Sequence, residues 1–310
     1  MAAKLSHRRE IQGLRALAVL AVITNHLFAD FLPGGFLGVD IFFLLSGYLI
    51  TAQLIELSTN EQMGSNLLKF YAGRIRRILP SALLVIWVTV ALAYRYLGPV
   101  IGNETLRDGR WATLFFANSH FNSLKVDYFE QGKSTPLLQH YWSLAVEEQF
   151  YLVWPVVLLL VAIIFRKRLS QLLLATLALL AIFSFCSIFI IEKTLTYFAT
   201  QTRIWELSIG ALVAILGTRA LPKITQWSAV LILIGSLFIV DSTDQAPGVV
   251  VLPALLATAL LLNITDKNLY NCSWESIDAL PGRYFLCALS LALAGYRTTS
   301  PTLFYRTINR

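Results

Sequence analysis

Charged residues are scarce in this sequence. Asp, Glu, Lys and Arg make up 14% of the 310 residues, whereas about 25% is usual in soluble globular chains. Hydrophobic residues, at 56%, dominate instead. The composition therefore excludes an ordinary soluble domain and indicates a membrane protein. The net charge of +7 comes largely from basic clusters beside apolar runs, so no soluble basic surface for a nucleic acid is predicted.

Cysteine is also rare. The three cysteines, Cys186, Cys272 and Cys287, lack metal-ligand spacing and predict no disulfide framework. We expect Cys186 to be a small core residue. The sequence also contains no Gly-rich phosphate loop and no zinc-binding His/Glu helix motif. No metal site and no permanently bound cofactor are therefore predicted.

Long apolar runs are the main feature that is present. They lie near 12–29, 36–55, 78–97, 145–165, 170–191, 204–217, 226–240 and 248–263, with a weaker run near 284–295. A helix needs about 20 apolar residues to cross a bilayer. The runs predict an all-α fold, a polytopic integral membrane helix bundle of about 8–10 transmembrane helices. Residues 1–263 form the expected transmembrane domain, and 264–310 form an irregular polar tail.

Basic residues set the expected orientation. Lys and Arg cluster before the first run, between the second and third, and after the fourth and sixth: Lys4, Arg8, Arg9, Lys69, Arg74, Arg76, Arg77, Arg166, Lys167, Arg168, Arg219 and Lys223. All fall on one side of an alternating topology, which the positive-inside rule makes cytoplasmic. The first run has no cleavage pattern, so we expect an uncleaved span with a cytoplasmic N-terminus. In the long outward segment 98–141 we expect a short interfacial helix around 111–118.

Arg15 and His26 lie inside the first apolar run, eleven positions apart. An Arg near the bilayer centre costs about 2.5–3.5 kcal/mol, so such residues rarely persist without a function. Eleven helical steps of about 100° place both side chains within about 20° of one face and roughly 16 Å apart. Because a histidine ordinarily exchanges a proton near pH 7, His26 is the candidate general base of this helix face.

Other helices are expected to bring ionisable groups to the depth of His26. His26 and Asp40 lie seven positions before and after Pro33, in a predicted helical hairpin, so Asp40 is the candidate carboxylate that orients the imidazole. Glu147 and Glu148 start another span at comparable depth. Adjacent helical residues point about 100° apart, so only one of the two is expected to face a cavity.

Several motifs occur in order over residues 9–215. They are Gly-Leu-Arg-Ala-Leu-Ala-Val at 13–19 followed by His26, Gly-Val-Asp-Ile-Phe-Phe at 38–43, Ser-Gly-Tyr-Leu-Ile at 46–50, Tyr-Ala-Gly-Arg-Ile-Arg-Arg-Ile-Leu-Pro at 71–80, Pro-Leu-Leu-Gln-His-Tyr-Trp-Ser-Leu-Ala-Val-Glu-Glu-Gln-Phe-Tyr at 136–151, and, as a weaker echo, Arg203 with Trp205, Glu206 and Gly210. This series resembles the membrane acyltransferases called acyltransferase family 3, whose relatives O-acetylate cell-envelope glycans in bacteria.

The resemblance implies a membrane O-acyltransferase in the bacterial cell inner membrane. It would move an acyl group, foremost acetyl, from a cytoplasmic acyl-CoA to a hydroxyl of an envelope glycan, such as lipopolysaccharide, peptidoglycan or a lipid-linked sugar. The expected partners are therefore the lipid bilayer, acetyl-CoA as donor substrate and the glycan acceptor.

Candidate roles follow from the implied reaction. The catalytic candidates are His26, Asp40, Glu147 and Glu148; the donor-binding candidates are Arg15, Arg74, Arg76 and Arg77; the acceptor-binding candidates are His140, Arg203 and Glu206. Arginine suits the donor because its planar fork binds phosphate bidentately. Arg203 and Glu206 are three positions apart, which also favours an intrahelical ion pair.

The resemblance is expected to end near residue 263. Family members carry a further aromatic-rich span, and many continue into an SGNH-type hydrolase domain. Neither pattern occurs here, so we expect a C-terminally truncated or altered member whose hydrolase domain or partner is absent from this chain. Two alternatives stay open. Aligned charges through a helix bundle also suit an ion or solute transporter, and a truncated chain would also suit an inactive remnant.

Overall fold

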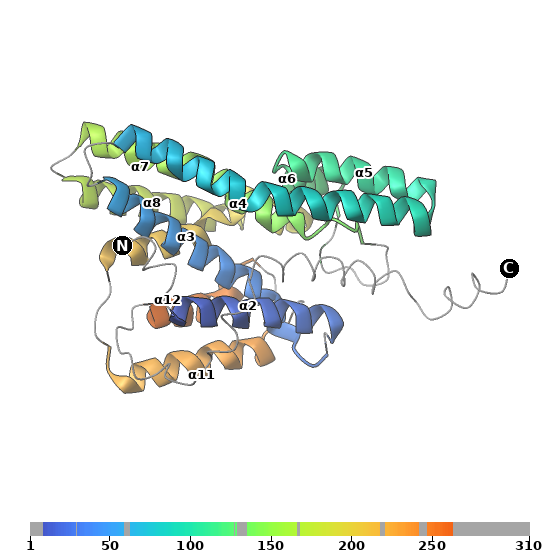
Figure 1. Cartoon of the computed structure of the whole chain (residues 1–310). Coiled ribbons are helices and arrows are strands. Elements are labelled where there is room, and N and C mark those ends of the chain that lie inside the picture. Colours follow the sequence, from blue (N-terminus) through green and yellow to red (C-terminus); the bar gives the residue numbers. More distant parts are fainter. Residues whose placement is uncertain are drawn as a thin grey trace. The chain divides into compact units, whose positions relative to one another are not determined.

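The structure of the chain, a computed structural model, describes residues 9–28, 30–58, 63–126, 128, 135–165, 168–217, 221–241 and 247–262. Within these residues every regular element is a helix and none is a strand (Figure 1). The expected all-α fold is therefore confirmed.

Eight helices coincide with the eight strong apolar runs of the sequence. They are α2 (Arg9–Leu27), α3 (Leu37–Ser58), α4 (Met63–Leu92), α7 (Tyr141–Ile164), α8 (Leu169–Ser187), α10 (Ile204–Leu216), α11 (Lys223–Ile239) and α12 (Leu252–Leu262). The segments long and apolar enough to cross a membrane are Pro33–Ile55, Leu67–Leu97, Tyr141–Ile164 and Leu169–Ser187. These helices indicate a multi-pass membrane protein. The weak run near 284–295 lies outside the described residues.

The chain divides into two compact units, residues 1–68 with 147–272 and residues 69–146 with 273–310. In the first unit, α10 packs against both α3 and α8, α2 packs against α3, and α11 packs against α12. The indole Nε1 of Trp154 donates to the hydroxyl of Thr51 at 2.8 Å, which ties α7 to α3 inside this unit.

Glycines allow α3 and α10 to approach very closely. A Cβ added at Gly210 would overlap the backbone oxygen of Leu44, and one added at Gly47 would overlap the backbone oxygen of Leu207. Helix interfaces in membranes commonly use small residues in this way. Lipid tails are as apolar as the helices, so the hydrophobic effect does not drive the helices together, and close packing of their backbones does so instead.

Replacing Gly210 tests this packing. Gly210→Ala is expected to lower the free energy of unfolding by about 1–3 kcal/mol, the usual cost of forcing extra volume into a packed interface. Gly73→Ala is the matched control, because a Cβ at Gly73 meets nothing within 4 Å. Thermal unfolding of both purified variants in the same detergent measures the difference. Equal midpoints for the two variants would show that the α3–α10 contact tolerates a methyl group.

The hairpin between α2 and α3 is confirmed, and one side chain fastens it. Nδ2 of Asn25 donates to the carbonyl oxygens of Leu32 at 2.9 Å and Pro33 at 3.0 Å. The connection then forms the short 3-10 helix η1 (Pro33–Phe36) before α3 begins. The chain therefore folds back along the end of α2. Sequence reasoning gave no role to Asn25.

The register of this hairpin differs from the expected one. A Cβ added at Gly38 would overlap the backbone oxygen of Ala18, so Asp40 lies nearer the level of Ala18 than that of His26. Eight helical residues separate those two levels, which corresponds to roughly 12 Å. The expectation that His26 and Asp40 share one depth is therefore wrong, because η1 packs beside α2 instead of extending beyond it.

Much of α8 presents apolar side chains outward. Leu179 and Phe183 are each 68% exposed, which suits a helix surrounded by lipid. Cys186 is also exposed on this helix. Its predicted place in the core is wrong, since its position along α8 falls on the outward face.

The second unit contains the larger part of α4, the π-helix η2 (Ala93–Leu97), α5 (Pro99–Thr113) and α6 (Ala117–Ser123). The segment 111–118, expected to be one helix, spans the turn between α5 and α6 instead. Phe115 adopts a positive φ of 58° at this turn, a conformation that ends a right-handed helix.

Candidate active site

His26 lies in the last turn of α2, and its imidazole is half-buried. Nδ1 is 2.8 Å from the carbonyl oxygen of Val22, one turn earlier. A carbonyl oxygen only accepts hydrogen bonds, so this contact assigns the proton to Nδ1 and the lone pair of the neutral imidazole to Nε2. In this tautomer Nε2 is the nitrogen that can take a proton.

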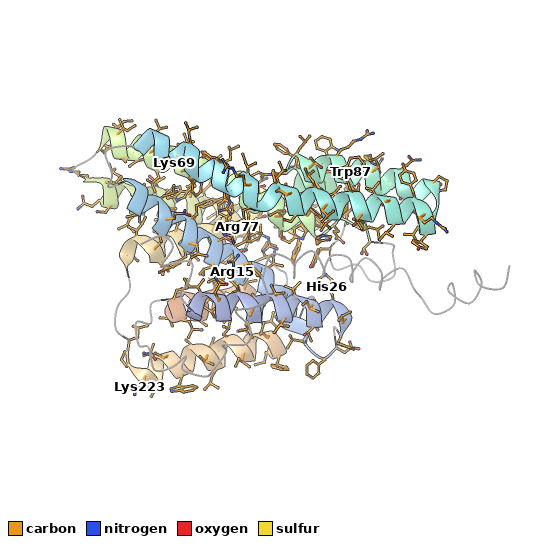
Figure 2. The ribbon with its side chains drawn as sticks, in the orientation of Figure 1. Arg15, His26, Lys69, Arg77, Trp87 and Lys223 are labelled. Carbon is orange, nitrogen blue, oxygen red and sulfur yellow. The ribbon has the colours of Figure 1, made fainter. Side chains whose placement is uncertain are left out.

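Arg15 is half-buried on the same helix. Because α2 is continuous from Arg9 to Leu27, helical geometry keeps Arg15 and His26 within about 20° of one face and roughly 16 Å apart. Figure 2 shows both labelled side chains along α2. One stripe of this helix therefore carries a permanent cation and a titratable imidazole. That the stripe lines a donor site remains a prediction.

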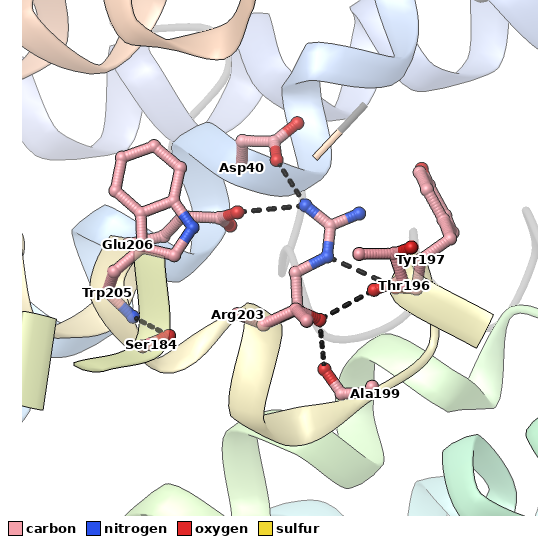
Figure 3. A network of polar contacts seen from close by, with 9 residues as sticks. Asp40, Ser184, Thr196, Tyr197, Ala199, Arg203, Trp205 and Glu206 are labelled. Atoms are coloured by element: carbon pink, nitrogen blue, oxygen red, sulfur yellow. Dashed lines mark hydrogen bonds and ion pairs between the residues drawn. The ribbon is translucent and has the colours of Figure 1, made fainter. Parts of the chain in front are cut away.

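A buried network of three ionisable side chains joins α3 to the start of α10 (Figure 3). Nη1 of Arg203 donates to Oδ1 of Asp40 at 2.6 Å and to Oε1 of Glu206 at 2.8 Å. Asp40 is 1% exposed, and the other two side chains are fully buried. The intrahelical ion pair expected between Arg203 and Glu206 is confirmed. We call these three residues the buried ion cluster.

The contacts within the buried ion cluster differ from the roles that the sequence predicted for its residues. Asp40 was expected to orient His26, but its carboxylate is the hydrogen-bond acceptor of Arg203. Arg203 and Glu206 were expected to bind the acceptor, but in this structure neither side chain is open to an outside molecule. The geometry supports an anchoring role for all three groups, because each charge lies against a charge of opposite sign.

The loop before α10 completes the surroundings of Arg203. Nε of Arg203 donates to the carbonyl oxygen of Tyr197 at 3.1 Å, and the guanidinium lies 4.4 Å from the Tyr197 ring centroid. The hydroxyl of Thr202 holds this loop by donating to the carbonyl oxygens of Thr196 and Ala199. Sequence reasoning missed Tyr197, because no helical spacing relates a loop residue to Arg203.

Glu147 and Glu148 are both half-buried near the start of α7. Oε2 of Glu147 accepts a hydrogen bond of 3.2 Å from the hydroxyl of Tyr151, one turn later. On the same helix, Gln149 accepts a hydrogen bond of 2.6 Å from the hydroxyl of Thr200. These contacts fix the start of α7 without choosing between the two glutamates as a catalytic group, so their roles remain predictions.

The remaining candidates lie in the second unit. Arg74 is half-buried on α4, whereas Arg76 and Arg77 are exposed. His140 is half-buried, and its ring centroid lies 4.8 Å from that of Tyr141. Exposed guanidinium groups suit the binding of phosphate, but donor binding by these arginines and acceptor binding by His140 stay predictions.

No metal centre emerges from the described residues, because they contain no group of three or more His, Cys, Asp and Glu side chains placed to hold an ion.

The sequence of this chain is similar to those of known proteins. A family model described as an acyltransferase domain matches residues 8–296, which extends past the expected end near 263. The putative peptidoglycan O-acetyltransferase YrhL of Bacillus subtilis (strain 168) is 38% identical over 221 residues, covering 68% of this chain and 34% of that protein. The O-acetyltransferase OatA of Staphylococcus aureus (strain NCTC 8325 / PS 47) is 37% identical over 206 residues, covering 66% and 34%.

The chain therefore spans about a third of the length of these curated relatives. No solved structure matches it.

Proposed function

This chain belongs to acyltransferase family 3, and from that membership we propose that it transfers an acyl group, foremost acetyl, to a hydroxyl of a cell-envelope glycan. The names of its relatives support acetyl as the group and peptidoglycan as one acceptor. We further propose acetyl-CoA as the donor, the bacterial inner membrane as the location and a cytoplasmic N-terminus, for which the basic clusters flanking the helices argue.

The observation that carries the proposal is the contact of His26 with its own helix. Because Nδ1 donates to the Val22 oxygen, Nε2 has the lone pair needed to take the hydroxyl proton as the sugar oxygen attacks the acyl carbon. A new ester bond forms as the thioester bond breaks, and the protonated imidazole gives its proton to the leaving thiolate, which yields free CoA. The permanent charge of Arg15 would meet the donor on the same helix face.

The length of the CoA donor suits the separation between Arg15 and His26. CoA is polyanionic and does not enter hydrocarbon, so its phosphates would stay near the membrane surface, and Arg74, Arg76 and Arg77 are the residues that we propose for binding them. The extended pantetheine arm would cover the roughly 16 Å between Arg15 and His26. The thioester would thereby reach the base while the nucleotide stays outside the bilayer core.

Transfer from labelled donor in vesicles tests the proposal. Inside-out vesicles that contain the chain and an entrapped β-1,4-linked N-acetylglucosamine tetrasaccharide receive radiolabelled acetyl-CoA from outside. We expect alkali-labile label in the saccharide, and none in vesicles without the chain. No label in the saccharide, with the protein shown to be inserted, would overturn the proposal. Ion flux without acyl product would favour a transporter instead.

A further inference from the structure

A histidine–carboxylate pair with no assigned role occurs in the second unit, within residues 69–146. Nε2 of His120 lies 2.8 Å from Oδ1 of Asp108, and both side chains are buried. Asp108 belongs to α5 and His120 to α6, two helices that pack against each other (Figure 1). The tight turn at Phe115 brings the two residues together although they are twelve positions apart.

The pair fixes the tautomer of His120. An ionised carboxylate only accepts hydrogen bonds, so the proton lies on Nε2 and the lone pair of the neutral ring lies on Nδ1. None of the hydrogen bonds among the described residues uses that nitrogen. Burial raises the pKa of the Asp108 carboxyl, and the contact with His120 acts in the opposite direction. The hydrogen bond from His120 therefore favours the ionised form of Asp108.

An exposed aromatic ring covers this pair. Trp111 stacks on His120 with ring centroids 5.6 Å apart and an interplanar angle of 14°, yet its side chain remains 43% exposed. Glu104 and Arg107, seven and four positions earlier on α5, share its helix face and are exposed. The exposed face of α5 therefore combines an aromatic plane with two charged hydrogen-bonding groups.

Neither stability nor lipid anchoring requires this arrangement. A buried hydrogen-bonded pair adds little stability compared with apolar residues of the same volume. An interfacial tryptophan that anchors a protein in the headgroup region needs no buried Asp–His pair behind it. A flat aromatic ring beside polar groups does suit a sugar ring, which has an apolar C–H face and hydroxyls at its edge.

We propose that Trp111, His120 and Asp108 form a carbohydrate-binding subsite on the α5–α6 hairpin, which holds the glycan acceptor. Trp111 stacks against a sugar ring, Nδ1 of His120 accepts a hydrogen bond from a sugar hydroxyl, and Asp108 is a positioning residue that keeps His120 in the required tautomer. The assignment of the ligand as acceptor rests on the proposed function, whereas saccharide binding itself does not.

Direct binding tests the subsite without the donor. The full chain in nanodiscs is titrated with the β-1,4-linked N-acetylglucosamine tetrasaccharide, and the Kd is measured by calorimetry. Trp111→Leu is expected to raise the Kd about tenfold, and Trp111→Phe, which keeps an aromatic plane, to raise it less. His120→Gln removes the ring lone pair but keeps an amide donor toward Asp108, and it is also expected to weaken binding.

Trp87→Leu is the matched control. Trp87 is 66% exposed on α4 (Figure 2) and belongs to no proposed site, so its loss should leave the Kd unchanged. A normal elution profile for each variant excludes misfolding, and the order wild type, Trp111→Phe, Trp111→Leu in affinity provides a graded readout that misfolding would not produce.

Three results would overturn the subsite. The first is an unchanged Kd in both Trp111→Leu and His120→Gln, and the second is equal weakening by Trp87→Leu. The third concerns the membrane. If Trp111→Leu lowers only the partitioning of the chain into lipid and leaves saccharide binding intact, the residue is a membrane anchor and the subsite is excluded. Failure of acetyl transfer with Trp111-dependent saccharide binding intact would refute the proposed function alone.

Discussion

His26→Asn is expected to slow acyl transfer by about 10²–10⁴-fold, the range that a positioned general base contributes. The reason lies in the two nitrogens of the imidazole. In the native protein Nδ1 is engaged by the Val22 oxygen, which leaves Nε2 as the basic atom. The asparagine amide can still donate toward that oxygen, but it has no basic nitrogen. The helix contact is therefore kept while the chemistry is removed.

Initial rates of ester formation from labelled acetyl-CoA, at equal amounts of inserted protein, measure the effect. Cys186→Ser is the control, because Cys186 is exposed on α8 and takes part in no proposed step; it should retain the wild-type rate. Equal accumulation of both variants separates lost chemistry from lost protein. A loss smaller than about tenfold in His26→Asn would exclude the imidazole as the essential base.

Arg203→Met is expected to destabilise the protein by about 3–5 kcal/mol, because it removes the cation from a buried pair of carboxylates. Asp40 and Glu206 would then face each other at 1% and 0% exposure without their guanidinium partner. The effect is measured by thermal unfolding in detergent, with the loss of the monodisperse elution peak as the readout. The yield of purified Arg203→Met is also expected to be lower than that of the wild type.

Neutral partners should reverse this loss. The triple variant Arg203→Met, Asp40→Asn, Glu206→Gln carries no buried charge, and replacing an entire buried ion cluster is often neutral or stabilising. We therefore expect it to unfold at a higher temperature than Arg203→Met alone. If Arg203→Met unfolds like the wild type, the cluster does not join α3 to α10. If the triple variant is no better than the single one, the loss comes from packing of the long Arg side chain, not from uncompensated charge.

Features that repeat along one helix could be predicted from the sequence. The eight strong apolar runs became helices because an apolar segment in lipid has to satisfy its backbone hydrogen bonds internally. The shared face of Arg15 and His26 and the ion pair of Arg203 with Glu206 follow from the same fixed helical period. Fold class and these local pairs therefore need no knowledge of how the helices pack.

Partners from different helices could not be predicted in this way. Asp40 was predicted to orient His26 on the assumption of a symmetric hairpin. The contacts of Asn25 and the close approach at Gly38 give the hairpin a different register. Asp40 therefore binds Arg203, 163 positions away in the sequence. A shift of a few residues in a helical hairpin changes the depth of every side chain beyond it.

The sequence by itself determined that this protein is a helical membrane acyltransferase-family chain with a cation and an imidazole on one helix face. Only the tertiary structure decided which charges neutralise one another and that Asp108, Trp111 and His120 meet. The physical reason is that helical periodicity acts over a few turns, whereas contacts between helices depend on turn geometry and on where small residues allow close packing.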